Sequence, residues 1–488
     1  MTRHPLLENQ LSSAPARPSF GTVILAVSLP MFMVALDNLM VTNALTSIRA
    51  DLGASVEDLQ WITNAYILGF AGLLLAAAAL GDRFGRKRVF VTGITAFTLT
   101  SVGGALSSST EALVLFRALQ GMSAAAVMPL SLTLLAMAVP AEKRGAAIGL
   151  WSGISGLAVA LSPLIGGAIT SGLDWQWIFW VNVPVGVVAV PLVLKAVSES
   201  RGAPVKLDLL GLVLACAGVV SLVWAIVNGH EKGWGSAPVV SAFAAAVVLL
   251  GAFIAWERKA SAPLLPLSFY RVRAFTLSNV VSLAVYFGMF GATFLIAQYL
   301  QTGLGHSAFV AGLWTLPWAV MPMFIAPQAG KLAAKVGAGR LMALGLAVSG
   351  AGLAWFALVV GVGTSDWAFV GPFVLAGAGM GLVFAPTATV VMGAVAPQHM
   401  GKASGANTTV RELGGALGIA VLASVFAAQG DFTGQQRFVD GLVPAIWIAV
   451  AVVLVGALFA LAIPRPKAAP APAAAPAPQA KEPAGATA

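Results

Sequence analysis

The stretch Gly81-Asp82-Arg83-Phe84-Gly85-Arg86-Lys87-Arg88 places a short charged hinge between two long apolar runs. A relaxed copy, Lys335-Val336-Gly337-Ala338-Gly339-Arg340, follows in the second half of the chain. Counted from Leu80 and Leu332, both stretches have Leu, a basic residue, Gly and Arg at relative positions 0, 3, 5 and 8. A basic loop that recurs at the same place in two halves of an apolar chain is typical of an internally duplicated membrane carrier.

The composition places the chain in a lipid bilayer. Hydrophobic residues fill 59% of its 488 positions and charged residues only 9%, whereas a water-soluble domain carries about 25% charged residues. About 20 apolar residues span the hydrocarbon core, and the chain has fourteen runs of this kind. They cover residues 20–45, 59–80, 89–107, 112–137, 146–170, 178–197, 209–228, 237–256, 274–297, 308–328, 341–361, 368–393, 403–429 and 441–463.

The basic residues give an independent test of orientation, because Lys and Arg accumulate in short cytoplasmic loops. With the N-terminus inside, nearly all of the 27 basic residues fall on the cytoplasmic side. Only Arg49, Lys232 and Arg437 fall outside, while Arg117 and Arg411 fall within spans. We therefore expect a multi-pass protein of the cell inner (plasma) membrane with both termini cytoplasmic. This topology also accounts for the net charge of +9, so no nucleic-acid partner is expected.

We expect an all-α polytopic membrane protein with 14 transmembrane helices, arranged as two pseudo-symmetric six-helix bundles plus two inserted helices. The expected divisions are a cytoplasmic N-terminal segment (1–19), an N-terminal six-helix bundle (20–197), two inserted helices with a cytoplasmic linker (198–273), a C-terminal six-helix bundle (274–463) and a cytoplasmic tail (464–488). The tail is rich in alanine and proline, a composition that buries little apolar surface and predicts disorder.

Several motifs resemble those of a known family. Gly81 to Lys87 is similar to the loop signature of the major facilitator superfamily, and Leu113, Arg117, Gln120 and Gly121 resemble its fourth-helix signature. Four further stretches resemble the fourteen-helix drug:proton antiporter branch, which includes multidrug and antibiotic efflux proteins. They are Leu36-Asp37, Gln60-Trp61 with Thr63 and Tyr66, Trp175-Gln176-Trp177-Ile178-Phe179 leading to Asn182-Val183-Pro184, and Arg411-Glu412-Leu413-Gly414-Gly415.

The resemblance implies a secondary active transporter that exports lipophilic drugs or antibiotics in exchange for protons by alternating access. Two positions depart from the branch. Ala158 and Ser162 stand where glycines usually precede Pro163, and Thr42 stands where the first helix usually has Asn. Asn43 follows one step later, which turns its amide by about 100° on a helix.

Four charged residues fall within the predicted spans: Asp37, Arg117, Arg411 and Glu412. A charge at the bilayer centre costs about 2.5–3.5 kcal/mol, so such groups are usually paired and functional. Asp37 and Arg117 are expected at depths of ~12 and ~8 Å from the outer surface, which predicts an ion pair if their helices are neighbours. The pair acts either as a proton switch or as a static packing contact. Glu412, beside Arg411, is either a second coupling group or a structural charge.

The charged loop also has two interpretations. The resemblance implies that Asp82, Arg83, Gly85 and Arg86 form a latch that holds the halves together on the cytoplasmic side in the outward-open state. Alternatively the basic residues, above all Lys87 and Arg88, bind anionic headgroups. Gly121, Pro163, Gly166 and Gly167 are candidates for close helix packing, and Pro163 with the two glycines is expected to interrupt its span so that the halves can rock.

No nucleotide site is expected. Gly401-Lys402 is the nearest approach to a phosphate loop, but Ala396 and Ala403 replace its first Gly and its hydroxyl residue. No metal-ligand cluster is found in the sequence. We therefore expect no enzyme and no cofactor, with protons as the coupling ion.

The candidate substrate cavity residues are Tyr66, Trp61, Asn43, Trp151 and Gln298, because aromatic side chains stack on flat organic molecules. Packing or contact with lipid is the alternative role for each aromatic residue. Asp37 and Glu412 each have an Arg that offsets their charge, which favours neutral or monocationic lipophilic substrates. We expect a monomer. A proton-linked metabolite uptake carrier and a non-transporting membrane sensor remain alternatives.

Overall fold

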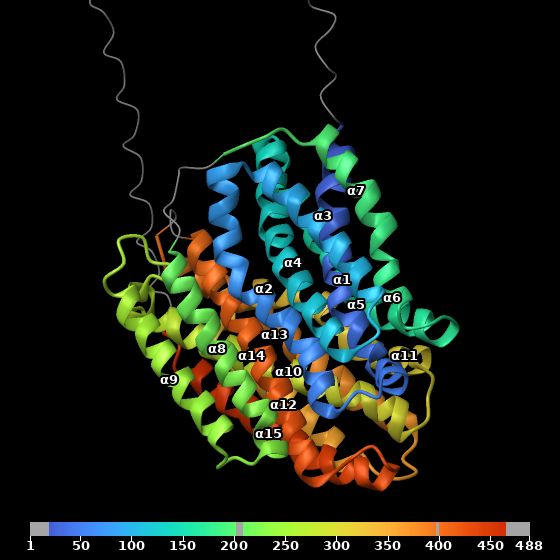
Figure 1. Cartoon of the computed structure of the whole chain (residues 1–488). Coiled ribbons are helices and arrows are strands. Elements are labelled where there is room, and N and C mark those ends of the chain that lie inside the picture. Colours follow the sequence, from blue (N-terminus) through green and yellow to red (C-terminus); the bar gives the residue numbers. More distant parts are fainter. Residues whose placement is uncertain (1–18, 202–207, 397–399, 465–488) are drawn as a thin grey trace, which may run out of the picture.

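The computed structural model describes residues 19–201, 208–396 and 400–464 (Figure 1). Almost all of the predicted N-terminal segment and cytoplasmic tail therefore lie outside the described residues. The described chain is helical and contains no β-strand. Its first helices are α1 (Phe20–Leu52), α2 (Val56–Phe84), α3 (Arg86–Ala105), α4 (Thr110–Ala138), α5 (Ala141–Gly172), α6 (Trp177–Trp180) and α7 (Asn182–Ala196).

A long hairpin of two helices, α8 (Leu209–Lys232) and α9 (Ala237–Glu257), follows. The remaining helices are η1 (Leu267–Arg271), α10 (Arg273–Gln298), η2 (Tyr299–Gly303), α11 (Ala308–Val336), α12 (Ala338–Val359), η3 (Asp366–Phe369), α13 (Val370–Gly393), α14 (Met400–Gln429) and α15 (Gln435–Leu461). In the described part of the chain, eleven helices are long and apolar enough to cross a membrane, with α6 and α7 counted as one. The all-helical, polytopic architecture is thus confirmed, whereas the total of 14 spans stays a prediction.

Some helices extend beyond the predicted spans. α1 continues to Leu52, past the predicted span of 20–45, so Arg49 lies in its last turn. The charged hinge is shorter than expected, because Gly85 is the one residue between α2 and α3 that is not helical. Its φ of +113° is a conformation that only glycine adopts easily. α5 is continuous through Pro163, so the predicted interruption is absent; a proline in a membrane helix removes one backbone donor without ending the helix.

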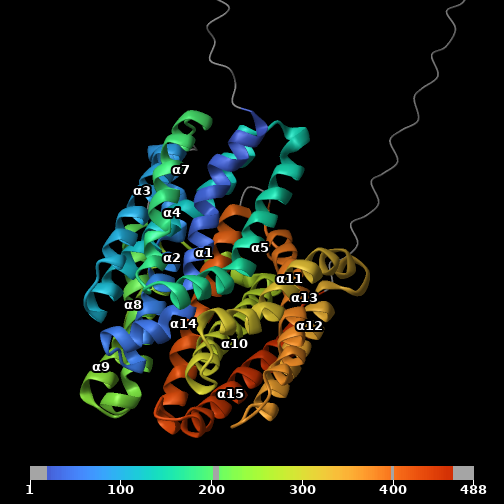
Figure 2. The same cartoon turned by 90° about the vertical axis from the view of Figure 1, so that its right-hand side faces the viewer.

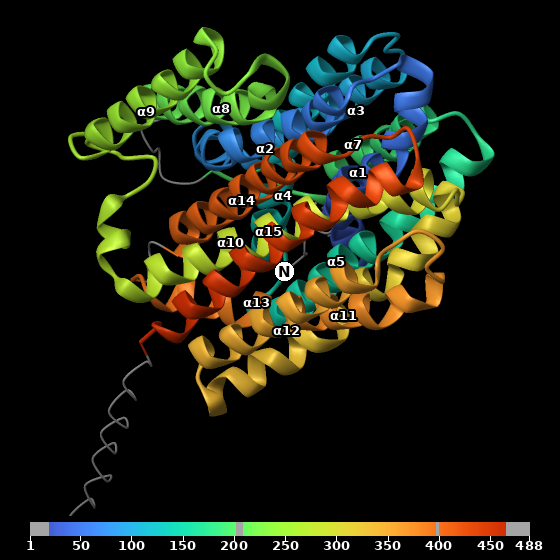
Figure 3. The same cartoon turned by 90° about the horizontal axis from the view of Figure 1, so that it is seen from below.

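The helices form two groups, α1–α7 and α10–α15, that lie at an angle to each other (Figure 2). The α8–α9 hairpin lies at one edge of the molecule (Figures 1 and 3). α8 packs against both groups: the sulfur of Cys216 lies close to Gly72 of α2, and the Ser424 hydroxyl of α14 donates to the Ile226 carbonyl at 3.0 Å. The hairpin therefore bridges the two groups.

Contacts between the two groups gather at one end of the bundle, where α1 ends and α2 begins. The topology expected from the basic residues makes this the outer end, and we use that name for it; we call the contact there the seam. At the seam, Gly167 of α5 meets the backbone of Ala308, and Gly312 of α11 meets the carbonyl of Pro163. The amide of Gln301 donates to the Asn43 carbonyl at 3.0 Å, and the Arg49 guanidinium lies over the Phe432 ring at 4.0 Å. Small residues and short polar contacts thus close the two groups together at this end.

Within the first group, α2 and α4 cross at Gly121, where an added Cβ would collide with the Tyr66 carbonyl. We expect Gly121→Ala to lower the free energy of unfolding by about 2 kcal/mol, because the backbone at the crossing must move apart. Thermal unfolding in detergent measures the effect. The control is Gly251→Ala on α9, where nothing lies within 4 Å of the added Cβ and a gain of about 0.5 kcal/mol is expected. Equal effects of the two substitutions would contradict the role of the crossing.

Candidate functional site

The centre of the first helix group contains an ion pair that is removed from solvent. Asp37 of α1 and Arg117 of α4 are both fully buried, and Nη1 of Arg117 lies 2.7 Å from Oδ2 of Asp37. The two residues are eighty positions apart in sequence, so helix packing alone brings them together. A buried charge pair of this kind is stable only when further hydrogen bonds satisfy the remaining polar atoms.

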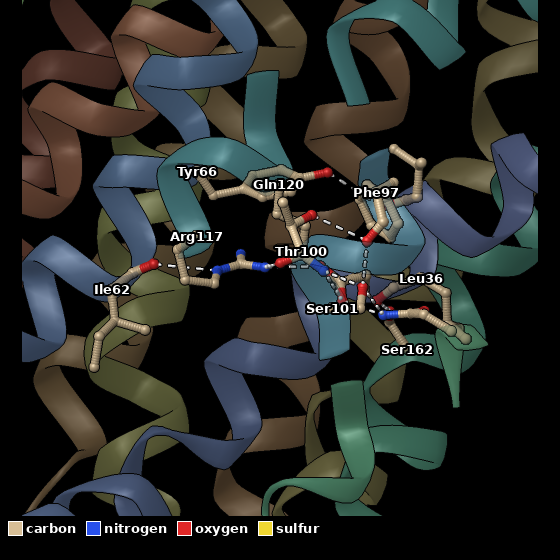
Figure 4. A network of polar contacts seen from close by, with 12 residues as sticks. Leu36, Ile62, Tyr66, Phe97, Thr100, Ser101, Arg117, Gln120 and Ser162 are labelled. Atoms are coloured by element: carbon tan, nitrogen blue, oxygen red, sulfur yellow. Dashed lines mark hydrogen bonds and ion pairs between the residues drawn. The ribbon is translucent and has the colours of Figure 1, made fainter. Parts of the chain in front are cut away.

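Those hydrogen bonds come from three other side chains (Figure 4). The amides of Gln120 and Asn182 donate to Oδ1 of Asp37 at 3.0 and 2.7 Å. Oε1 of Gln120 accepts from Arg117 at 2.6 Å, and both amides also reach the Ser101 hydroxyl. The Asp37 carboxylate thus accepts hydrogen bonds from three donors on α4 and α7, two of them neutral, and Ser101 of α3 joins the two amides.

The local sequence explains how these donors reach Asp37. The helix after α5 is interrupted at Val181, so Asn182 becomes the first residue of α7. The turn before it is fixed by Trp175, whose indole donates to the Asp51 carboxylate at 2.7 Å. On the other side of α1, the Ser162 hydroxyl donates to the Leu36 carbonyl at 2.5 Å and ties α5 to the residue next to Asp37.

Arg117 also contacts α2. Its Nε donates to the Ile62 carbonyl at 3.3 Å, and its Cζ lies 4.2 Å from the centroid of the Tyr66 ring, a cation–π contact. The Tyr66 hydroxyl is 3.4 Å from the Val34 carbonyl. Nη2 of Arg117 is buried and finds no hydrogen-bond partner among the described residues. The guanidinium therefore has one donor free for a second partner.

The second group of helices contains another buried charge centre. The Arg411 guanidinium donates to the Tyr286 hydroxyl and lies 4.4 Å from the centre of that ring. It also lies 5.9 Å from the Phe384 ring. Glu412 is nine-tenths buried, and within the described chain it makes neither a hydrogen bond nor an ion pair with Arg411. The two side chains point in directions about 100° apart on the helix, so the expectation that Arg411 offsets the charge of Glu412 remains a prediction.

The charged loop makes its contacts within the first group. Asp82 accepts from Nε of Arg86 at 2.7 Å. The Glu199 carboxylate, just after α7, accepts from the backbone N–H groups of Lys87 and Arg88 at 3.0 and 3.2 Å. Arg83 is exposed, with its Cζ 5.2 Å from the Phe84 ring. In this structure the described contacts of the loop fix α3 to the end of α7.

The remaining candidate residues are spread along the bundle. Asn43 and Gln298 are buried near the outer end, where the Gln298 amide donates to Phe294 of its own helix at 2.8 Å. Trp151 is partly buried and donates to the Ser131 hydroxyl at 3.2 Å, and Trp61 packs partly buried against the core. An added Cβ at Gly166 would lie 3.1 Å from Cα of Met40, so this glycine allows α5 to approach α1.

The sequence motifs include residues of this site to which the sequence assigns no role. Gln120 and Asn182 belong to signatures that were noted in the sequence, but no role followed from their positions. Ser101 was missed, since a single hydroxyl in an apolar span gives no signal of its own. Tyr286 and Phe384 are also without a pattern that distinguishes them from packing aromatics. Only the packing of helices shows that these residues surround a charge.

Comparison with known proteins gives a family match, similar export proteins and a solved structure with the same fold. A family model described as Major Facilitator Superfamily matches residues 27–419. The tetracenomycin C resistance and export protein of Streptomyces glaucescens is 34% identical over 87% of this chain and 79% of its own length. The cephamycin export protein CmcT of Amycolatopsis lactamdurans is 36% identical over 81% of this chain and 82% of its own length. The crystal structure of peptide transporter POT with sulfate has the same fold, with a TM-score of 0.68 at 15% identity over 93% of this chain and 97% of its own.

The role of Asn182 can be tested by stability. We expect Asn182→Leu to lower the free energy of unfolding by about 2 kcal/mol, because it removes a hydrogen bond to a buried charge. Asn228→Leu is the matched control, since the Asn228 amide donates only to the Trp224 carbonyl of its own helix; about half the effect is expected there. Thermal unfolding of the two variants measures the difference. A smaller loss for Asn182→Leu than for the control would show that the contact with Asp37 is weak.

Proposed function

The chain belongs to the Major Facilitator Superfamily, a family of membrane transporters and not of enzymes, and on this premise we propose that it exports lipophilic drugs or antibiotics in exchange for protons. The buried pair of Asp37 and Arg117 carries the proposal, because removal from water favours proton binding by a carboxylate while the adjacent cation opposes it, so movement of Arg117 can control the proton. The names of the relatives, which are resistance and export proteins, support the outward direction of transport.

The proposed cycle depends on the charge of Asp37. When Asp37 takes up a proton, its attraction for Arg117 falls, and the guanidinium is left with its contacts to Gln120, Tyr66 and the Ile62 carbonyl. The free Nη2 of Arg117 then allows the side chain to turn toward another partner. The ion pair and the helices that hold it thus have two arrangements, and proton binding selects between them.

Alternating access in this proposal uses the seam. With the proposed topology, the contacts of the two helix groups at this end belong to the state that is closed outside. Opening to the outside requires the seam to part and the inner ends to close. In that state the latch is formed by Asp82, Arg83, Gly85 and Arg86. These residues exchange part of their present contacts within the first group for contacts with the second.

The proposed topology has fourteen spans, formed by the eleven apolar helices together with α2, α3 and α5. The first and second bundles are residues 20–197 and 274–463, with 198–273 as the insertion. Both termini face the cytoplasm, and the protein works as a monomer. This arrangement keeps the basic residues of the loops inside.

Glu412 is the second coupling group in this proposal. It is buried and without a hydrogen bond in the described chain. In the first group, the Tyr66 ring contacts Arg117. Substrates are neutral or monocationic lipophilic molecules, bound with the help of Trp61, Tyr66, Asn43, Trp151 and Gln298.

Replacing Asp37 tests proton coupling. In a pump-deficient host that expresses Asp37→Asn, drug resistance is expected to fall to within about twofold of the host without the protein, because a carboxamide takes up no proton in this role. A susceptibility panel measures the change, and a blot confirms equal amounts in the membrane. Asp440→Asn is the control, since Asp440 is exposed and bonded only to Gln436 in the described chain; it should keep full resistance. Proton-driven export by Asp37→Asn would remove the proposed switch.

Replacing Asp82 tests the latch. Spin labels at Ser198→Cys and Gly393→Cys, in a Cys216→Ser background, report the separation of the inner ends. Asp82→Asn is expected to lower the fraction of molecules with closed inner ends about fivefold. This change corresponds to the loss of one partly exposed ion pair, which contributes roughly 1 kcal/mol. Arg88→Gln is the control, because Arg88 is 72% exposed and 3.8 Å from its partner. An equal effect of both variants would favour headgroup binding over a latch.

A further inference from the structure

Two amide side chains near the outer end of α2 are buried without partners. Gln60 and Asn64 are 0% exposed. The side-chain nitrogen and oxygen atoms of both residues make no hydrogen bond with any described residue. Other buried amides make at least one hydrogen bond: Asn182 donates to Asp37, Asn228 donates to the Trp224 carbonyl, and Gln298 donates to the Phe294 carbonyl although its oxygen has no partner in the described chain. Since burying an unpaired polar group is unfavourable, this exception calls for an explanation.

The two amides lie on the side of α2 that faces the second helix group. Residues four apart share one side of a helix, and successive residues turn by 100°. Gly69 of α2 meets the backbone of Ala118 on α4, and Gly72 meets Cys216 of α8. Gln60 and Asn64 lie roughly opposite Gly69. Because α4 and α8 occupy the sides marked by Gly69 and Gly72, and α14 also packs against α2, we infer that the two amides face α14.

The facing helix provides no partner for them. Between Glu412 and Ser424, residues 413–423 of α14 are all glycine or apolar. Ser424 donates to the Ile226 carbonyl of α8. Asn64 lies eight positions from the start of α2, about 12 Å from the outer end, which is the depth of the apolar stretch on α14. The seam therefore presses two amides against an apolar surface.

We propose that Gln60 and Asn64 are further functional residues of the transport cycle: they line the outer path when it is open, and their loss of water on closure opposes the closed seam. This inference rests on the proposed alternating access. When the seam parts, the amides regain hydrogen bonds to water. The open state is therefore more stable, relative to the closed state, than it would be with apolar residues at these two positions. The two residues therefore set the balance between the closed and open outer ends.

Spin labels across the outer end measure this balance. Leu106 and Val362 lie at the outer ends of the two groups and are 68% and 56% exposed, so both are replaced by Cys in the Cys216→Ser protein. The test variant adds Gln60→Met and Asn64→Leu, which keep the side-chain volumes and remove the polar atoms. The control adds Thr63→Val, because the Thr63 hydroxyl is buried but already bonded to the Leu59 carbonyl at 3.3 Å.

In lipid nanodiscs, we expect the fraction of molecules with a long distance between the outer labels to be about tenfold lower in the double variant than in the parent. A change of about tenfold is what one unsatisfied buried polar group contributes. The control is expected to stay within about twofold of the parent. The midpoint of thermal unfolding should be equal or higher in the double variant, since it removes unpaired polar atoms from the closed protein. A lower midpoint would show that the amides are satisfied in the folded protein and would overturn the inference.

The same experiment separates this inference from the proposed function. If the parent shows a single outer distance at every pH and with every drug, alternating access itself fails. If the parent shows two distances and the double variant leaves their ratio unchanged, or favours the long one, the transport proposal stands and the role of Gln60 and Asn64 is refuted.

Discussion

A carboxylate removed from water inside an apolar bundle needs hydrogen-bond donors, and the first helix group is organised around that need. Asp37 accepts hydrogen bonds from Arg117 and Gln120 of α4 and from Asn182 of α7. Each donor is in turn held by a neighbour, such as the Ser101 hydroxyl or the Tyr66 ring. Because the cost of leaving the charge unpaired is large, proton uptake at Asp37 changes the stability of every contact in this network.

The two halves satisfy their polar groups differently. In the first group the Asp37 carboxylate has three donors, while Nη2 of Arg117 has no partner in the described chain. In the second group Arg411 bonds to Tyr286, while Glu412 is buried without a hydrogen bond in the described chain. The amides of Gln60 and Asn64 are also unpaired among the described residues. The proposed cycle assigns movement to each of these unsatisfied groups.

The glycines allow this arrangement to pack. Gly121 lets α4 approach Tyr66, and Gly167 and Gly312 let α5 and α11 cross at the seam. A side chain at these positions would separate the helices that carry Arg117 and the outer contacts. Close packing through small residues gives the halves surfaces that meet and part as units, while the α8–α9 hairpin contacts both of them.

The sequence by itself determined the membrane class, the helical architecture and the existence of intramembrane charges, because hydropathy and charge placement are properties of short stretches. It also predicted the pairing of Asp37 with Arg117 through their depths. It did not determine that Arg411 turns to Tyr286, that Ser101 and Asn182 complete the Asp37 network, that α5 continues as a helix through Pro163, or that Gln60 and Asn64 face an apolar helix. Only the tertiary structure decided these, because they depend on the rotation and neighbours of each helix, which residues far apart in the chain set together.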